Sequence, residues 1–163
     1  MMRSQRGFGL GLGTSYFETL VMPALILTVL ALVAIPAWLD HKARERITGG
    51  LAQAAKAQAA VERAFMTKGP GDFSQAPVSG WTPPKPGEFV ESIRISRTGI
   101  ITVRYTAKVA TAEENELQIV PMADGKPLDL SNPASKGRKF SWQCGGGAGN
   151  TTVRESRRPE TCR

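Results

Sequence analysis

The stretch LVMPALILTVLALVAIPAWL, residues 20–39, contains no formally charged residue. Its length of about twenty residues is what an α-helix needs to cross the hydrocarbon core of a bilayer. Apolar side chains would lie on every face of that helix, so the segment requires lipid or closely packed protein around it. The sequence therefore predicts a transmembrane helix.

A secretory signal peptide is the alternative interpretation, because Arg3 and Arg6 precede the apolar run, and basic residues precede the apolar core of signal peptides. The run is longer than a usual signal core, and no small-residue cleavage pattern closes it. A helical pattern also continues beyond it. We therefore expect the segment to be retained.

Two prolines, Pro23 and Pro36, lie inside the apolar run. Each removes a backbone donor and weakens an isolated helix. Membrane helices tolerate proline where neighbouring helices satisfy the freed carbonyls. The pair indicates a helix that packs among copies of itself, with local melting or bending near Pro36.

Residues 40–68 are rich in Ala, Lys, Glu, Gln and Arg, which favour helix formation. Apolar residues recur at spacings of 4, 3, 7 and 4, which places them on one helical face: Ile47, Leu51, Ala54, Val61 and Phe65. The sequence Gly69-Pro70-Gly71 ends the pattern. We expect one helix from about Thr14 to Lys68, with Gly49-Gly50 as a weak point.

Strand patterns follow a loop rich in Pro, Gly and Ser at residues 72–87. In FVESIRIS (89–96), Phe89, Ile93 and Ile95 alternate, and IITVRYTA (100–107) alternates after a turn at 97–99, so the two predict a β-hairpin. Residues 117–120 and 139–144 predict two more strands. The expected fold class is α+β, with the long helix packed on a four-stranded antiparallel sheet.

Cys144 and Cys162 are the two cysteines of the chain, too few for the usual four-ligand metal cage. A disulfide between them predicts an oxidising compartment. It would close a loop over 144–162 and stabilise the fold by about 3 kcal/mol in the chain-entropy model.

The chain has a formal net charge of +7, which permits contact with nucleic acid, anionic lipid or an acidic partner. Basic residues concentrate in and near the cysteine-bounded loop: Arg154, Arg157, Arg158 and Arg163, with Lys136, Arg138 and Lys139. They form either a solvated face or an anion-binding surface for DNA or acidic glycans. Arg154, Arg157 and Arg158 are the candidate anion-binding residues.

No pattern typical of catalysis occurs in the sequence. The lone His41 follows the apolar run without an obvious partner, and Gly145-Gly146-Gly147 lacks the downstream Lys-Ser/Thr of a phosphate-binding loop. We expect no enzymatic activity, no cofactor and no metal site.

The C-terminal stretch FSWQCGGGAGNTTVRESRRPETCR (140–163) resembles the type IVa pilins, which have a strand ending Trp-x-Cys and a proline three residues before the second cysteine, here Pro159. The helix AIPAWLDHKARERITGGLAQAAKAQAAVERAF (34–65) and the hairpin FVESIRISRTGIITVRYTA (89–107) also fit that family. The resemblance spans nearly the whole chain and implies a long helix carrying a four-stranded sheet, followed by a C-terminal disulfide loop.

The leader is where the chain departs from the pilin pattern. Arg6-Gly7-Phe8 matches the usual start, but only a cut after Gly13, which makes Thr14 the first residue, places Glu18 at the fifth mature position. The resemblance thus implies a leader at 1–13 (alternatively 1–7), an apolar helix at 14–39, an amphipathic helix at 40–68 and a globular part at 69–163.

The resemblance further implies cleavage by a prepilin peptidase, N-methylation, and assembly by the pilus machinery into a homopolymeric filament. The subunit would reside in the inner membrane before assembly and in an extracellular pilus afterwards, and it would support adhesion, twitching motility and DNA uptake. Glu18 would pair with the N-terminal amine of a neighbouring subunit. Alternatively, Glu18 is only an acidic residue that the helix dipole favours at the N-terminus of the helix.

Two other functions fit the same sequence. One is a minor pilin or a type II secretion pseudopilin, which shares the architecture. The other is a monomeric single-pass membrane protein with a basic periplasmic binding module.

Overall fold

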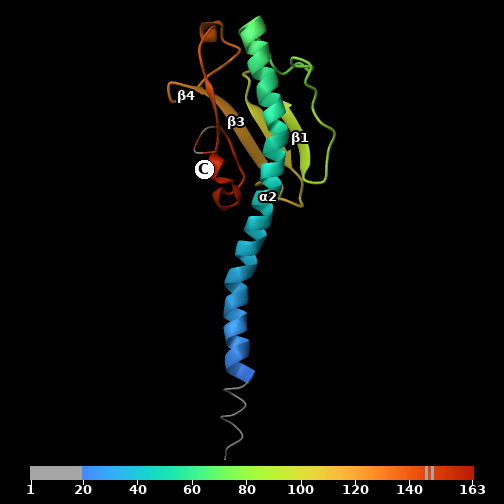
Figure 1. Ribbon diagram of the computed structural model, residues 1–163, viewed down its shortest axis with the longest axis vertical. Helices are drawn as coiled ribbons and strands as arrows, with labels where there is room; N and C mark the ends of the chain where they lie inside the picture. The colour runs from blue at the N-terminus through green and yellow to red at the C-terminus, as the bar shows by residue number, and fades with distance from the viewer. Residues whose placement is uncertain (1–19, 146, 148) are drawn as a thin grey trace, which may run out of the picture. The chain divides into compact units, whose positions relative to one another are not determined.

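The computed structural model describes residues 20–145, 147 and 149–163. The chain divides into two compact units between Leu39 and Asp40. The described part of the first unit is helical, whereas the second combines helix, sheet and loops (Figure 1).

Helix α2 (Met22–Lys68) contributes to both units. Pro23 lies near the described start of the helix, which directly follows the π-helical residues Leu20 and Val21. After Lys68, Gly69 takes a φ of 79°, and its N–H donates to the carbonyl oxygen of Phe65 at 2.9 Å. This left-handed glycine is a common helix terminator, which explains where α2 ends. The expected helical residues 14–19 lie outside the described residues.

The second half of α2 buries one face made mainly of small side chains. Its buried residues recur every three or four positions: Ala43, Ile47, Gly50, Ala54, Ala57, Ala60, Val61, Ala64 and Phe65. Leu51, which the sequence pattern places on this face, is only half-buried. The position that approaches the sheet is instead Gly50.

The second unit contains one antiparallel sheet of five strands, which lies against α2 (Figure 1). The strands are β1 (Val90–Ile95), β2 (Ile101–Tyr105), β3 (Glu116–Ala123), β4 (Lys126–Pro127) and β5 (Ser141–Cys144). Strands β1, β2 and β3 are neighbours in that order. Met122 of β3 pairs with both Pro127 of β4 and Ser141 of β5, so β4 and β5 lie on opposite edges of β3.

The predicted α+β fold is confirmed, and the four predicted strands correspond to β1, β2, β3 and β5. Strand β4 is an addition of two residues. It follows Asp124 and Gly125, which have φ values of 52° and 73°. Asp-Gly favours a tight hairpin turn that needs two such angles, so the sequence carries a local signal for this hairpin.

The core forms where the inward-facing residues of three strands meet in register. Ile93, Val103 and Leu117 are paired across β1, β2 and β3 and are all fully buried. At the start of β1 the register shifts between Val90 and Ser92. Because a shift of one residue exchanges the two faces of a strand, Val90 joins the buried core, and the predicted Phe89 is partly buried and packs against that core.

Tyr105 connects the sheet to α2. Its side chain is fully buried, and its hydroxyl donates to the carbonyl oxygen of Ile47 at 3.0 Å. Burial raises the pKa of this phenol. A Cβ atom added to Gly50 would lie 2.6 Å from Cε1 of Tyr105, closer than two carbon atoms can pack. Gly50 is therefore the residue that lets this tyrosine fit beneath the helix.

Candidate functional site

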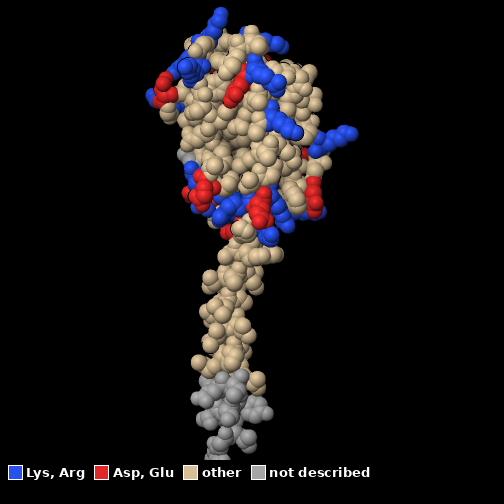
Figure 2. Space-filling model, in the orientation of Figure 1, with Lys and Arg blue, Asp and Glu red and all other residues tan. Residues whose placement is uncertain are grey.

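The described residues of the first unit present an apolar helical surface. Every large hydrophobic side chain here is exposed, with exposed fractions of 43–71%: Leu20, Val21, Met22, Leu25, Ile26, Leu27, Val29, Leu30, Leu32, Val33, Ile35, Trp38 and Leu39. Helix α2 contains an 18-residue stretch of mean hydropathy 2.3 that is long and apolar enough to cross a membrane. Among the described residues, charged side chains begin at Asp40, in the second unit (Figure 2).

This apolar surface needs a covering that the described residues do not supply. Exposed apolar patches of soluble monomers rarely exceed a few hundred Å² and mark interaction or membrane sites when they do. A helix that is apolar on all faces is stable in lipid or in the centre of an assembly. The site can therefore bind acyl chains or other apolar helices.

Pro36 lies within the continuous helix α2. Because proline has no N–H, the carbonyl of Leu32 lacks its usual helical partner. Local melting or bending near Pro36 in an assembly stays a prediction.

The predicted processing and pairing residues lie outside the described residues. These are Gly13 and Thr14, their alternatives Gly7 and Phe8, and the acidic residue Glu18. Their roles stay predictions.

The predicted disulfide is present between Cys144 and Cys162, with their Cα atoms 4.6 Å apart. It closes a loop that is also attached to strand β3. The hydroxyls of Thr151 and Thr152 accept hydrogen bonds at 3.0 Å from the backbone N–H groups of Gln118 and Glu116, respectively. The loop is thus held by backbone groups of the sheet as well as by sulfur.

Val153 is the apolar anchor of this loop, and it is fully buried. Sequence reasoning missed it because the stretch between the cysteines is otherwise polar or glycine-rich. A single valine after two threonines is a weak signal without the fold.

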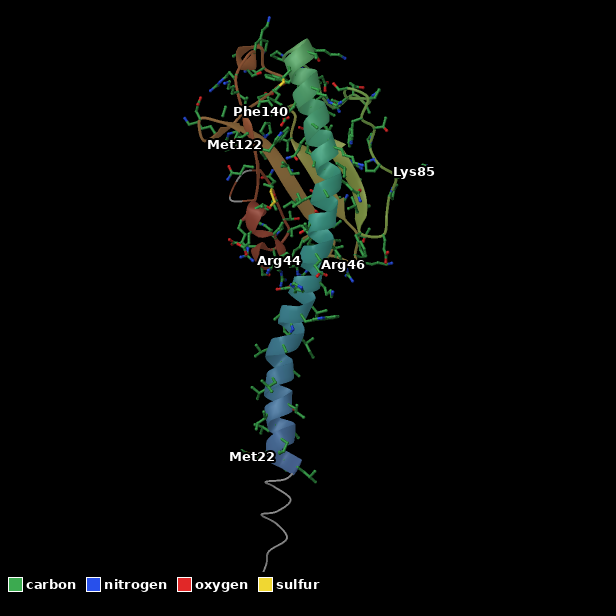
Figure 3. The ribbon with its side chains drawn as sticks, viewed as in Figure 1. Met22, Arg44, Arg46, Lys85, Met122 and Phe140 are labelled. Carbon is green, nitrogen blue, oxygen red and sulfur yellow. A yellow bond between two sulfur atoms is a disulfide. The ribbon has the colours of Figure 1, made fainter. Side chains whose placement is uncertain are left out.

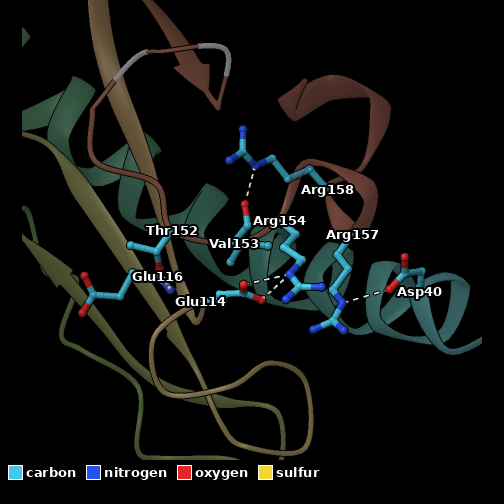
Figure 4. A network of polar contacts seen from close by, with 8 residues as sticks. All are labelled: Asp40, Glu114, Glu116, Thr152, Val153, Arg154, Arg157 and Arg158. Carbon is cyan, nitrogen blue, oxygen red and sulfur yellow. Dashed lines mark hydrogen bonds and ion pairs between the residues drawn. The ribbon is translucent and has the colours of Figure 1, made fainter. Parts of the chain in front are cut away.

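The three candidate anion-binding arginines all make contacts within the chain (Figure 4). Arg157 Nε donates to Asp40 Oδ1 at 2.9 Å, and Arg154 Nε lies 2.7 Å from the carboxylate of Glu114. Arg158 Nε donates to the carbonyl oxygen of Val153 at 2.7 Å.

A guanidinium has five N–H donors, so each arginine still has N–H groups that these contacts do not use. Anion binding by Arg154, Arg157 and Arg158 stays a prediction, although two of the three positive charges face a carboxylate.

The Asp40–Arg157 pair joins the disulfide loop to the residues of α2 that begin the second unit. The hydrogen bond from Arg157 lowers the pKa of Asp40, while desolvation opposes that shift, and Ser156 and nearby arginines add to the lowering. Arg44 Nη2 strengthens the attachment by donating to the carbonyl oxygen of Ser156 at 2.7 Å. This pairing could not be predicted from sequence, because its two partners are 117 positions apart.

The described residues contain no group of three or more His, Cys, Asp or Glu side chains placed to hold a metal ion. His41 Nε2 lies 3.4 Å from the carboxylate of Glu45, one helical turn away, and both side chains are largely exposed. This arrangement is a surface contact of a helix.

Comparisons with known proteins agree with this architecture. A family model described as pilin, a bacterial filament protein, matches residues 43–163. The fimbrial protein EcpC of Eikenella corrodens aligns with the chain over 138 residues at 29% identity, covering 83% of each protein. A crystal structure of a type IV pilin of Pseudomonas aeruginosa superposes with a TM-score of 0.51 at 23% identity, covering 74% of this chain and 97% of that one.

Proposed function

The chain belongs to the pilin family of bacterial filament proteins and has the fold of a type IV pilin, and from that premise we propose that it is the major structural subunit of a type IV pilus. Pilins are structural proteins, and we assign this chain no catalytic step. The subunit polymerises through its apolar helix.

The observation that carries this proposal is the uncovered apolar surface at residues 20–39. In the inner membrane, before assembly, acyl chains cover it. In the filament, apolar helices of other copies cover it instead. Moving from one apolar surrounding to the other changes little apolar area exposed to water, so association depends on packing and on polar contacts rather than on the hydrophobic effect.

Glu18 supplies the polar contact in this proposal. Its carboxylate pairs with the N-terminal amine of a neighbouring subunit in a low-dielectric filament core, where attraction between charges is strong but must offset their desolvation. The main service of the pair is to set the register of one subunit beside the next. Glu18→Ala should impair filament assembly and leave membrane insertion intact, and normal filaments from this variant would refute the role.

Processing by a prepilin peptidase creates that amine. A cut after Gly13 gives Thr14 as the N-terminal residue, N-methylated, with Glu18 fifth. Mass spectrometry of the N-terminal peptide from filaments tests this site, because a cut after Gly7 leaves a peptide that is longer by residues 8–13. In that case Glu18 lies too far from the amine to pair in the family manner.

Adhesion, twitching motility and DNA uptake are the activities we propose for the filament, located on the cell surface. A minor pilin or pseudopilin role requires low copy number, so the abundance of the subunit in sheared surface material decides between these assignments. A monomeric membrane protein gains nothing from Glu18, so it would show no defect when that residue is neutralised.

A further inference from the structure

A groove of about 660 Å³ lies in the second unit, between the last turns of α2 and the segment at residues 136–140. Pockets that bind small molecules fall in the range of about 300–1,000 Å³. The groove shares no residue with the apolar surface at 20–39, with the disulfide, or with the arginine contacts described above. The groove is therefore a different surface from the apolar one at residues 20–39.

The floor of the groove is apolar. Phe65 and Phe140 pack edge to face with ring centroids 5.6 Å apart, and Phe140 lies beside α2 (Figure 3). Next to them, Met66 is 79% exposed, and among the described residues of 40–163 it is the one exposed large hydrophobic side chain. Methionine is over-used at surfaces that adapt to varied partners.

The rim of the groove is basic. Lys136, Arg138 and Lys139 line it and are exposed. Arg138 pairs with Asp124, whereas neither lysine forms an ion pair within the described part of the chain.

Glu62 is the carboxylate on the lining, and it already accepts a hydrogen bond from Nε1 of Trp142 at 2.6 Å. Within residues 20–163 as far as the structure describes them, the groove thus offers two lysine charges without ion pairs beside the exposed thioether of Met66.

We propose that this groove binds an acidic peptide segment of a partner protein, one that presents a large apolar side chain between carboxylates. The apolar side chain covers Met66 and Phe140, and the carboxylates face Lys136 and Lys139. Charge complementarity of this kind sets partner choice and raises the association rate. A nucleic acid backbone matches only the charges and leaves the apolar floor open to water.

A short synthetic peptide with one tryptophan between pairs of glutamates tests the proposal directly. The full chain, held in nanodiscs of zwitterionic phospholipid, is titrated against the fluorescent peptide, and anisotropy reports binding. We expect saturable binding that weakens as salt rises. Two comparison peptides, with serine for the tryptophan or lysine for the glutamates, should each bind at least about tenfold more weakly, because each lacks one half of the required chemistry.

Variants locate the binding. The double variant Lys136→Glu/Lys139→Glu should weaken binding of the acidic peptide at least about tenfold. The matched control combines Lys56→Glu with Lys85→Glu, two exposed lysines outside the groove that give the same change in net charge, and it should bind within about twofold of the unmodified chain.

Met66→Ser should weaken binding of the tryptophan peptide several-fold and leave binding of the serine peptide unchanged. This difference is expected if Met66 contacts the tryptophan directly.

Three outcomes would overturn the proposal. One is equal binding of the tryptophan and serine peptides, which makes the groove a purely electrostatic surface that duplex DNA would occupy as well. Another is an equal loss of affinity in the groove variant and its lysine control. The last is no binding of the acidic peptide at low salt.

Discussion

The two halves of α2 differ in what covers them. In residues 20–39 large aliphatic side chains are exposed on all faces, and in residues 40–68 a stripe of alanine, glycine and a few larger residues is buried under the sheet. The second half also carries the charged residues that keep its outer face in water. One helix can therefore be covered by its own chain over half its length and depend on lipid or other molecules for the rest.

Placing a carboxylate in each half gives the largest expected contrast. Val61→Asp buries an unpaired charge in the core and should lower the free energy of unfolding by about 3–5 kcal/mol. Val29→Asp, at an exposed position, should change that free energy by less than about 0.5 kcal/mol yet disfavour membrane insertion by roughly 3 kcal/mol. Denaturant unfolding and membrane fractionation measure the two quantities, and equal loss of folding in both variants would contradict the comparison.

Removing the disulfide should have the next largest effect. Replacing Cys144 and Cys162 together by serine should lower the stability of the second unit by about 3 kcal/mol, because the unfolded chain regains the freedom of the loop. The described residues of the first unit contain no cysteine, so helicity of 20–39 in membranes should not change. Calorimetry of the variant, with the reduced unmodified protein as control, measures the loss, and an unchanged transition temperature would show that Val153 and the threonines hold the loop unaided.

Two adjacent glycines of α2 provide a matched test of packing against the sheet. Gly50→Ala should cost about 1–3 kcal/mol, since the new methyl group overlaps the ring of Tyr105. Gly49→Ala, where nothing lies within 4 Å of an added Cβ, should stabilise the protein by about 0.5–1 kcal/mol. Thermal unfolding followed by circular dichroism measures both changes in stability. If both variants were stabilised or both destabilised, Tyr105 would not constrain the helix.

The Asp40–Arg157 pair gives the smallest predicted effect. Because this contact lowers the pKa of Asp40, its stabilisation is complete above the unfolded pKa of about 4 and is lost as pH falls through the lower folded value. Asp40→Asn should therefore cost about 0.5–1 kcal/mol near neutral pH and progressively less in acid. Unfolding curves across that pH range measure the difference, and a cost that stays constant with pH would assign it to packing instead.

Elements whose information is local were predictable from sequence. The periodicity of the helix, the alternation in the β1–β2 hairpin and the spacing of Cys144 and Cys162 each correspond to a feature of the structure. Periodicity also found most of the buried stripe. The predicted stripe included Leu51 and not Gly50, because hydrophobic patterns do not count a glycine as a packing residue. The close approach of the helix to the sheet nevertheless requires a glycine at position 50.

Contacts between distant parts of the chain were not predictable in the same way. The register shift at Val90, the burial of Val153 and the pairing of Arg157 with Asp40 depend on the completed fold. Charge clusters in a sequence also do not show which cations are already paired. In the basic loop Arg154 and Arg157 face carboxylates, whereas Lys136 and Lys139, which form no ion pair among the described residues, line the groove at the end of α2.

Electron cryo-microscopy of filaments sheared from cells tests most directly what covers residues 20–39. We predict filaments of this subunit in which these helices pack against one another in the centre, away from water. A subunit that remains monomeric in membranes while the pilus machinery is active, or filaments whose residues 20–39 contact only lipid or solvent, would contradict it.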